Sequence, residues 1–166
     1  MRILGVDPAL SVTGYGVIDA NNNKISLVEA GVVVTSASQN ISMRLNKIHR
    51  ALAQLISETR PGVMVLEKLY AHYRHPTTAH ILGQARGVIC LAAAEARIAL
   101  VEYPATRVKK AIVGKGLAGK YQVQKMVAMT LDIKKLPKYT DVTDALALAI
   151  AHQRIAHLDK ITGISQ

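Results

Sequence analysis

The chain has 166 residues, half of them hydrophobic, which suits one compact domain that buries its own core. Lysine and arginine number 21 against 11 acidic residues, and the net charge of +10 points to a polyanionic partner or an acidic membrane surface. The single cysteine, Cys90, excludes an intramolecular disulfide and a multi-cysteine zinc site, and we interpret it as a small buried hydrophobe. The first apolar run stops at Asp7, too early for a signal or transmembrane segment, so we expect a soluble, cytoplasmic protein.

The N-terminal third of the chain predicts strands. Apolar and β-branched residues favour strands over Arg2–Asp7, Gly14–Ala20 and Ile25–Thr35, and the run of asparagines at 21–23 is typical of a turn. Because the connections are short, we expect these three strands to form an antiparallel meander.

In the rest of the chain, predicted helices first alternate with strands, and the last three predicted elements are helices. Apolar residues recur at helical spacing from Ile41 to Ile56, and Pro61 ends that helix. A strand at Val63–Glu67 follows, and because a helix feeds it we expect it to lie parallel to the first strand. The later predicted elements are a strand at Ala99–Tyr103 and helices at Thr77–Arg97, Pro104–Ile112, Tyr121–Leu131 and Asp141–His157. This order predicts an α/β fold, a mixed five-stranded sheet flanked by helices, in one domain over residues 1–158 with a short tail at 159–166.

Four acidic residues occupy positions that this topology would bring together. Asp7 ends the first strand, and Glu67 ends the fourth, which should lie beside it. Asp141 and Asp144 are three residues apart at the start of the last helix and therefore share a face. Singly, each acid could instead cap a turn or helix or form a surface ion pair. Together, four carboxylates would raise one another's pKa unless cations lay among them, which is the arrangement that two-metal phosphodiester hydrolysis requires.

Four sequence blocks, in order over nearly the whole chain, resemble the signature blocks of RuvC-type Holliday-junction resolvases, which have the RNase H-like fold; they are Gly5–Pro8, Val12–Ile18, Leu82–Val88 and Asp141–Ala147. The resemblance implies a homodimeric endodeoxyribonuclease that acts on four-way DNA junctions in homologous recombination and DNA repair. It also implies that two Mg²⁺ ions per site, or Mn²⁺ in their place, are bound by Asp7, Glu67, Asp141 and Asp144. Paired nicks would leave 5′-phosphate and 3′-hydroxyl ends, and a RuvAB-type branch-migration complex would be a partner. Ala9 departs from the glycine usual in the family, which restricts that turn but removes no ligand.

The segment from Gly114 to Lys120 has the G-x4-G-K spacing of a phosphate-binding P-loop. However, Tyr121 follows where a serine or threonine would hold Mg²⁺, and a predicted helix rather than a strand precedes the loop. By resemblance, Lys120 instead lies near the scissile phosphate and Lys109 holds the DNA backbone. Lys115 is a further candidate DNA contact, or else a solvated surface lysine.

The segment after Glu67 is rich in aromatic and basic residues. Tyr70 occupies a position at which the family has an aromatic that stacks on bases opened at the crossover, although a tyrosine at the edge of the core would look the same. Tyr73 and Arg74 are further candidate DNA contacts. The histidines lack thiols or a nearby carboxylate, so we favour DNA contact or plain surface over metal binding for His72, His75 and His80, and a supporting role stays open for His152.

The predicted helix from Thr77 carries small residues that permit close helix approach, and it is our candidate dimer interface, although a buried helix would have the same composition; these residues are Gly83, Ala85, Gly87 and Ala92–Ala94. Three other functions compete with junction resolution. A nuclease of the same fold could cut another substrate, such as an RNA–DNA hybrid. An actin-like nucleotide-binding domain would need a second half that 166 residues cannot supply. A non-catalytic junction binder would gain nothing from acids that face phosphates.

Overall fold

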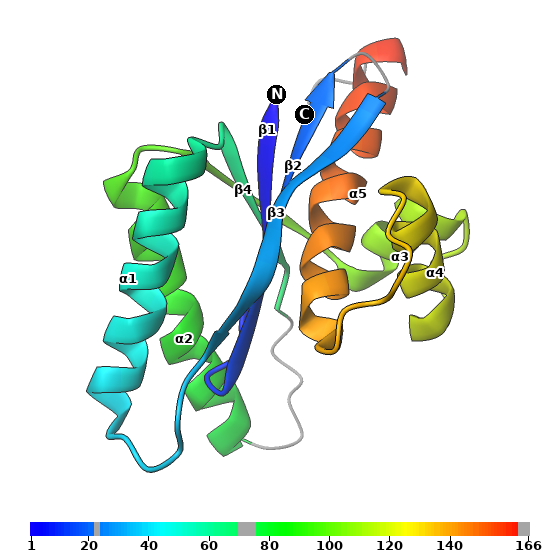
Figure 1. Cartoon of the computed structure of the whole chain (residues 1–166). Helices are drawn as coiled ribbons and strands as arrows, with labels where there is room; N and C mark the ends of the chain where they lie inside the picture. The colour runs from blue at the N-terminus through cyan, green and yellow to red at the C-terminus, as the bar shows by residue number, and fades with distance from the viewer. Residues whose placement is uncertain (22–23, 70–75, 163–166) are drawn as a thin grey trace.

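A five-stranded sheet separates two layers of helices in the computed structural model, which describes residues 1–21, 24–69 and 76–162 (Figure 1). The strands are β1 (Arg2–Asp7), β2 (Val12–Asn21), β3 (Lys24–Val34), β4 (Val63–Glu67) and β5 (Ala99–Tyr103). Their order across the sheet is β3-β2-β1-β4-β5, with β1, β2 and β3 antiparallel and β4 and β5 parallel to β1. The predicted α/β fold with a mixed five-stranded sheet is therefore confirmed.

Five helices cover the two faces of this sheet: α1 (Ile41–Thr59), α2 (Pro76–Glu95), α3 (Ala105–Val113), α4 (Lys120–Thr130) and α5 (Thr140–Thr162). Alternate residues of a strand point to opposite faces, and β1 shows how this divides the core. Leu4 and Val6 pack with the residues of α1 and α2, whereas Ile3 packs with those of α3, α4 and α5. Asp7 has the parity of Ile3 and therefore faces the α5 layer.

The helix α5 is the central helix of its layer. Every residue from Ala145 to Ala151 is buried, because α5 packs on β1 and β2 on one side and on α3 and α4 on the other. A helix that is apolar all round requires this kind of enclosure. None of the helices in the described parts of the chain is both long enough and apolar enough to span a membrane.

Several element boundaries differ from those predicted. The second helix ends at Glu95 rather than Arg97, because Arg97 adopts a left-handed backbone with φ 55° where the chain turns into β5. The last helix continues to Thr162, so residues 159–162, which we expected in a tail, are helical. The C-terminal end of this helix was predicted from the apolar pattern, which weakens in the sequence after Leu158. The helical backbone nevertheless continues to Thr162.

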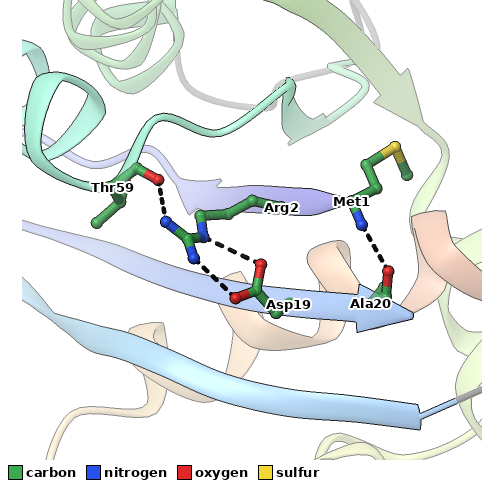
Figure 2. A network of polar contacts seen from close by, with 5 residues as sticks. All are labelled: Met1, Arg2, Asp19, Ala20 and Thr59. Carbon is green, nitrogen blue, oxygen red and sulfur yellow. Dashed lines mark hydrogen bonds and ion pairs between the residues drawn. The ribbon is translucent and has the colours of Figure 1, made fainter.

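One arginine ties three elements together at the N-terminal end of β1 (Figure 2). The Arg2 guanidinium donates to both carboxylate oxygens of Asp19 on β2, at 3.0 and 2.8 Å, and to the backbone carbonyl of Thr59 at the end of α1, at 2.5 Å. The pKa of Asp19 is lowered mainly by this hydrogen bonding. The charges of Arg2 and Asp19 are thus matched locally.

Candidate active site

Two of the four acids singled out in the sequence lie at the opposite end of the sheet, where β1 and its neighbour β4 end. Asp7 ends β1, and Glu67 ends β4, the parallel neighbour in which Leu66 is in register with Val6. Glu67 shares the side-chain parity of Val63 and Val65, which pack in the α5 layer. Both carboxylates therefore lie at one end of the sheet on the face that α5 covers.

Glycines in β1 and β2 allow α5 to lie unusually close to this face. A Cβ atom at Gly5 would overlap the carbonyl oxygen of Ala145, and one at Gly14 would overlap the backbone of Asp141. Gly14 is in register with Asp7 on the neighbouring strand. The first turn of α5 is therefore packed directly against the strand position next to Asp7.

This packing brings the other two acids to the same place. Asp141 lies in the first turn of α5, and Asp144 lies one turn later on the same face. The N-terminus of a helix carries partial positive charge from its unpaired N–H groups, which favours carboxylates there. The elements thus place Asp7, Glu67, Asp141 and Asp144 at the same end of the sheet.

The electrostatics of the four acids show that they act on one another. Burial, followed by the negative charges of Asp144, Asp141 and Glu67, raises the pKa of Asp7 to about 7. Burial and the charge of Asp144 also raise the pKa of Glu67. A buried carboxylate among like charges is unfavourable in its ionised form. This end of the sheet therefore holds more negative charge than its own surroundings neutralise.

Lys120, the first residue of α4, partly offsets that charge. Its Nζ lies 2.7 Å from Oδ2 of Asp144, and this hydrogen bond raises the lysine's pKa. The loop before it joins two helices, with Gly114 in a left-handed conformation (φ 83°) after α3 and Gly119 as the N-cap of α4. A P-loop instead joins a strand to a helix, so the structure supports the rejection of that motif.

Two further cations act on Glu67 from different directions. Lys109 on α3 and Arg86 on α2 both lower the pKa of Glu67 against the effect of burial. Lys109 was predicted as a DNA-backbone contact, and its position near Glu67 places it at the acidic end of the sheet. Lys115 is exposed in the loop between α3 and α4.

The four acids were also predicted to bind metal. Their oxygens are the hard donors that Mg²⁺ and Mn²⁺ prefer, and the raised pKa of Asp7 is what a bound cation would reverse. Across residues 1–21, 24–69 and 76–162, however, no group of three or more His, Cys, Asp or Glu side chains is arranged to hold an ion. The donor chemistry fits, whereas the side chains are not drawn together into a ligand set.

Other predicted residues are not gathered at this site or cannot be placed. His80 contacts Gln84 on α2, at 2.9 Å, and Nδ1 of His152 lies 2.9 Å from the hydroxyl of Tyr103 in the α5 layer. Cys90 is half-buried, and burial raises the pKa of its thiol. Five predicted residues fall outside the described part of the chain: Tyr70, His72, Tyr73, Arg74 and His75.

The turn after Asp7 accommodates the alanine that departs from the family pattern. Ala9 is not among the described residues with positive φ, so a side chain causes no backbone strain there. The buried Thr13 hydroxyl donates to the Ala9 carbonyl at 2.5 Å and holds the turn closed. Sequence reasoning did not identify the role of Thr13, the contacts of Gly5 and Gly14 with α5, or the role of Arg86; a polar residue at an inward-facing strand position was the available signal for Thr13.

Comparison with known proteins agrees with this geometry. Residues 3–152 match the family model described as crossover junction endodeoxyribonuclease RuvC. The protein of that name from Rhodopirellula baltica is 42% identical over 93% of this chain and 87% of its own length. The structure of Thermus thermophilus RuvC has a TM-score of 0.87 at 31% identity, covering 95% of this chain and 96% of that one. The T. thermophilus protein in complex with a Holliday junction substrate matches with the same TM-score at 29% identity, covering 95% of this chain and 96% of that one. The chain therefore belongs to the RuvC family of crossover junction endodeoxyribonucleases.

Proposed function

We propose that this chain resolves four-way DNA junctions by paired, symmetric nicks that leave 5′-phosphate and 3′-hydroxyl ends. The observation that carries the proposal is the convergence of four carboxylates at one end of the sheet, within a chain of net charge +10. The excess of basic residues supports binding to a polyanion. Four acids within the binding protein would repel that polyanion, and they are useful only if it is to be hydrolysed. We expect this to occur in the cytoplasm, in recombination and repair, together with a RuvAB-type branch-migration complex.

In this proposal Asp7, Glu67, Asp141 and Asp144 hold two Mg²⁺ ions, for which Mn²⁺ can substitute. The chemistry that bound cations supply at such a site is activation of the attacking water and neutralisation of charge on the leaving oxygen. The protein contributes a fixed frame: two strand ends and the first turns of one helix, packed together through glycines. The positive end of α5 also favours the ionised acids.

The basic residues around the acids have separate roles. Lys120 forms an ion pair with Asp144, and an ammonium group held beside the acids would suit stabilisation of the negative charge of the transition state. Lys109 and Lys115 hold the DNA backbone on either side. Tyr70, Tyr73 and Arg74 belong to the segment after Glu67 and remain expected DNA contacts.

Two nicks require two sites, and we propose that α2 forms the interface of a homodimer. Leu91 is half-exposed on α2, and a side chain at Gly83 or Gly87 would meet no atom within 4 Å in the single chain. These residues recur at intervals of four and form one outward stripe of the helix. Leu91→Glu should shift the protein from dimer to monomer in light scattering after size exclusion, and an unchanged dimer would place the interface elsewhere.

The function is tested with a labelled synthetic four-way junction, incubated with and without Mg²⁺ and resolved on a sequencing gel. We expect symmetric cuts only with Mg²⁺, with no comparable cutting of plain duplex or of an RNA–DNA hybrid. Preferential cutting of the hybrid would instead support a nuclease of the same fold with a different substrate. Junction binding should also weaken steeply as salt rises, because phosphate contacts release counterions.

A further inference from the structure

Arg86 on α2 contacts the backbone of Glu67 rather than its carboxylate. Its Nη1 donates to the carbonyl oxygen of Glu67 at 2.9 Å, and its Nη2 pairs with Oε1 of Glu102 on β5. The Arg86 side chain is only 12% exposed, so this pair is shielded from solvent on the arginine side. A guanidinium held by a carboxylate on one side has a fixed direction in which its second arm can donate.

The side chains of Glu102 and Glu67 lie on opposite faces of the sheet. Glu102 is in register with Leu66, which packs in the α1 and α2 layer, whereas Glu67 is in register with Tyr103, which packs in the α5 layer. Arg86 therefore holds the backbone of Glu67, the last residue of β4, from the α2 face of the sheet. The Glu67 carboxylate points toward the other acids on the α5 face. The adjoining amide of Lys68 donates to the carbonyl of Tyr103 at 2.8 Å, so the strand end is held on both sides.

We propose that Arg86, anchored by Glu102, is a positioning residue that fixes the carboxylate of Glu67 in the acid cluster and links α2 to the active site. The inference rests on the proposed role of Glu67 as a metal ligand. Partners that orient a ligand without touching the metal commonly contribute about 10- to 100-fold to metal affinity or activity. Because α2 also carries the proposed dimer stripe, a shift of this helix would reach Glu67 through the hydrogen bond from Arg86 to its carbonyl oxygen.

The molecule contains a matched control at the other end of the sheet. Arg2 has the same chemistry as Arg86: one arm pairs with a carboxylate, Asp19, and another donates to a backbone carbonyl, that of Thr59 (Figure 2). Arg2 lies at the end of β1 remote from Asp7, and the hydrogen bonds of its side chain within the described part of the chain reach only Asp19 and Thr59. Arg2→Gln therefore removes a comparable clamp without touching the acids.

The experiment compares Arg86→Gln, Arg86→Lys, Glu102→Gln and Arg2→Gln in the full chain. Junction cleavage is measured under single-turnover conditions over a range of Mg²⁺ concentrations, together with junction affinity without metal and the melting temperature. For Arg86→Gln we expect the half-saturating Mg²⁺ concentration to rise about 10-fold or more, with junction affinity within about twofold because no DNA contact is lost. Glu102→Gln should shift the Mg²⁺ dependence in the same direction by less, and Arg86→Lys should recover part of the loss.

A purely structural role predicts a different pattern. In that case Arg86→Gln and Arg2→Gln would lower the melting temperature without moving the Mg²⁺ dependence, and that outcome would overturn the proposal. If Arg86→Gln does not fold, Glu102→Gln decides the matter, because an unchanged Mg²⁺ dependence in that variant would be equally damaging.

Calorimetric titration with Mn²⁺ in the absence of DNA separates this inference from the proposed function. If the wild-type chain cuts no junction but binds Mn²⁺, and Arg86→Gln alone weakens that binding, the substrate assignment fails and the positioning role stands. If the wild-type chain cuts junctions and Arg86→Gln leaves both the Mn²⁺ affinity and the Mg²⁺ dependence unchanged, the positioning role fails and the substrate assignment stands. A wild-type chain that neither binds Mn²⁺ nor cuts junctions would refute both.

Discussion

The carboxylates at the two ends of β1 have opposite electrostatic environments. At the N-terminal end, Asp19 lies against the guanidinium of Arg2, and its pKa is lowered. At the C-terminal end, Asp7 is buried among three other acids, and its pKa is raised to about 7. The six residues of β1 thus separate Arg2, which neutralises a carboxylate of β2, from Asp7, whose surroundings make its ionised form unfavourable.

This difference separates residues that stabilise the fold from residues for which we propose a catalytic role. A carboxylate with a close cationic partner favours the folded state, whereas a buried carboxylate crowded by like charges opposes it and is maintained only because the rest of the structure holds it in place. Proteins commonly concentrate such unfavourable groups where they act chemically. The comparison between Asp7 and Asp19 can be tested directly.

The largest expected effect is the loss of cleavage in Asp7→Asn. Removing one carboxylate from the proposed metal site should reduce single-turnover junction cleavage by about 1000-fold or more, since the lost charge stabilisation amounts to several kcal/mol. Junction affinity in gel-shift assays should be retained. Asp19→Asn, at the other end of the sheet, should cleave at close to the wild-type rate in conditions where it is folded; full activity of Asp7→Asn would refute the site.

A methyl group at Gly14 should affect both the fold and the site. Gly14→Ala places a Cβ within the backbone of Asp141, and overpacking of this kind costs about 1–3 kcal/mol or more. We expect a lower free energy of unfolding in urea and reduced cleavage, since α5 must move away from Asp7. Gly62→Ala is the control: Gly62 lies at the start of β4, and its added Cβ would find its nearest neighbour, the Arg2 carbonyl oxygen, at 3.9 Å. Equal stability of the two variants would show that α5 tolerates the shift.

In metal-free buffer, Asp7→Asn should stabilise the protein, and the gain should depend on pH. The folded chain keeps the Asp7 proton up to pH about 7, whereas the ordinary pKa of an aspartate side chain is 3.8. Between these values the unfolded state binds fewer protons than the folded state, so wild-type stability falls as pH rises. The gain from Asn should grow from near zero around pH 4 to on the order of 2–4 kcal/mol at pH 8.

The free energy of unfolding should change with the opposite sign when Asp19, beside the other end of β1, is replaced. The pKa of Asp19 is lowered, so its contribution to stability is present above the unfolded-state pKa and lost as pH falls through the folded-state pKa. Asp19→Asn should therefore be less stable than the wild type at pH 8. Urea titrations in EDTA at several pH values check both signs, and a destabilised Asp7→Asn at pH 8 would contradict the picture of unfavourable charge.

The smallest expected effect concerns Lys120. Lys120→Met should slow cleavage by roughly 10- to 100-fold through loss of transition-state stabilisation, while stability changes little because a largely exposed ion pair contributes weakly. Lys115→Met, five residues earlier in the exposed loop, should weaken binding slightly without changing the single-turnover rate at saturation. Equal effects of the two variants would reduce Lys120 to a general DNA contact.

The sequence predicted the fold and the acids more securely than the details around them. Alternation and helical periodicity gave the strands and helices because both patterns reflect burial on one face. They failed at Arg97, where a left-handed residue ends a helix without glycine, and at residues 159–162, where helix continues without an apolar pattern. The role of Arg86 could not be predicted, since its partners, Glu67 and Glu102, lie 19 and 16 residues away in sequence.

By itself, the sequence determined the order of elements, because strand ends and helix starts are local features that short stretches of chain encode. Its four signature blocks pointed to the family, and the acids at two strand ends and one helix start were the predicted site. Only the tertiary structure decided how closely α5 approaches β1 and β2, how far the pKa of Asp7 is raised, and which arginine holds Glu67 and which holds Asp19. These properties depend on distances between groups remote in sequence, and both burial and Coulomb interactions change steeply with such distances.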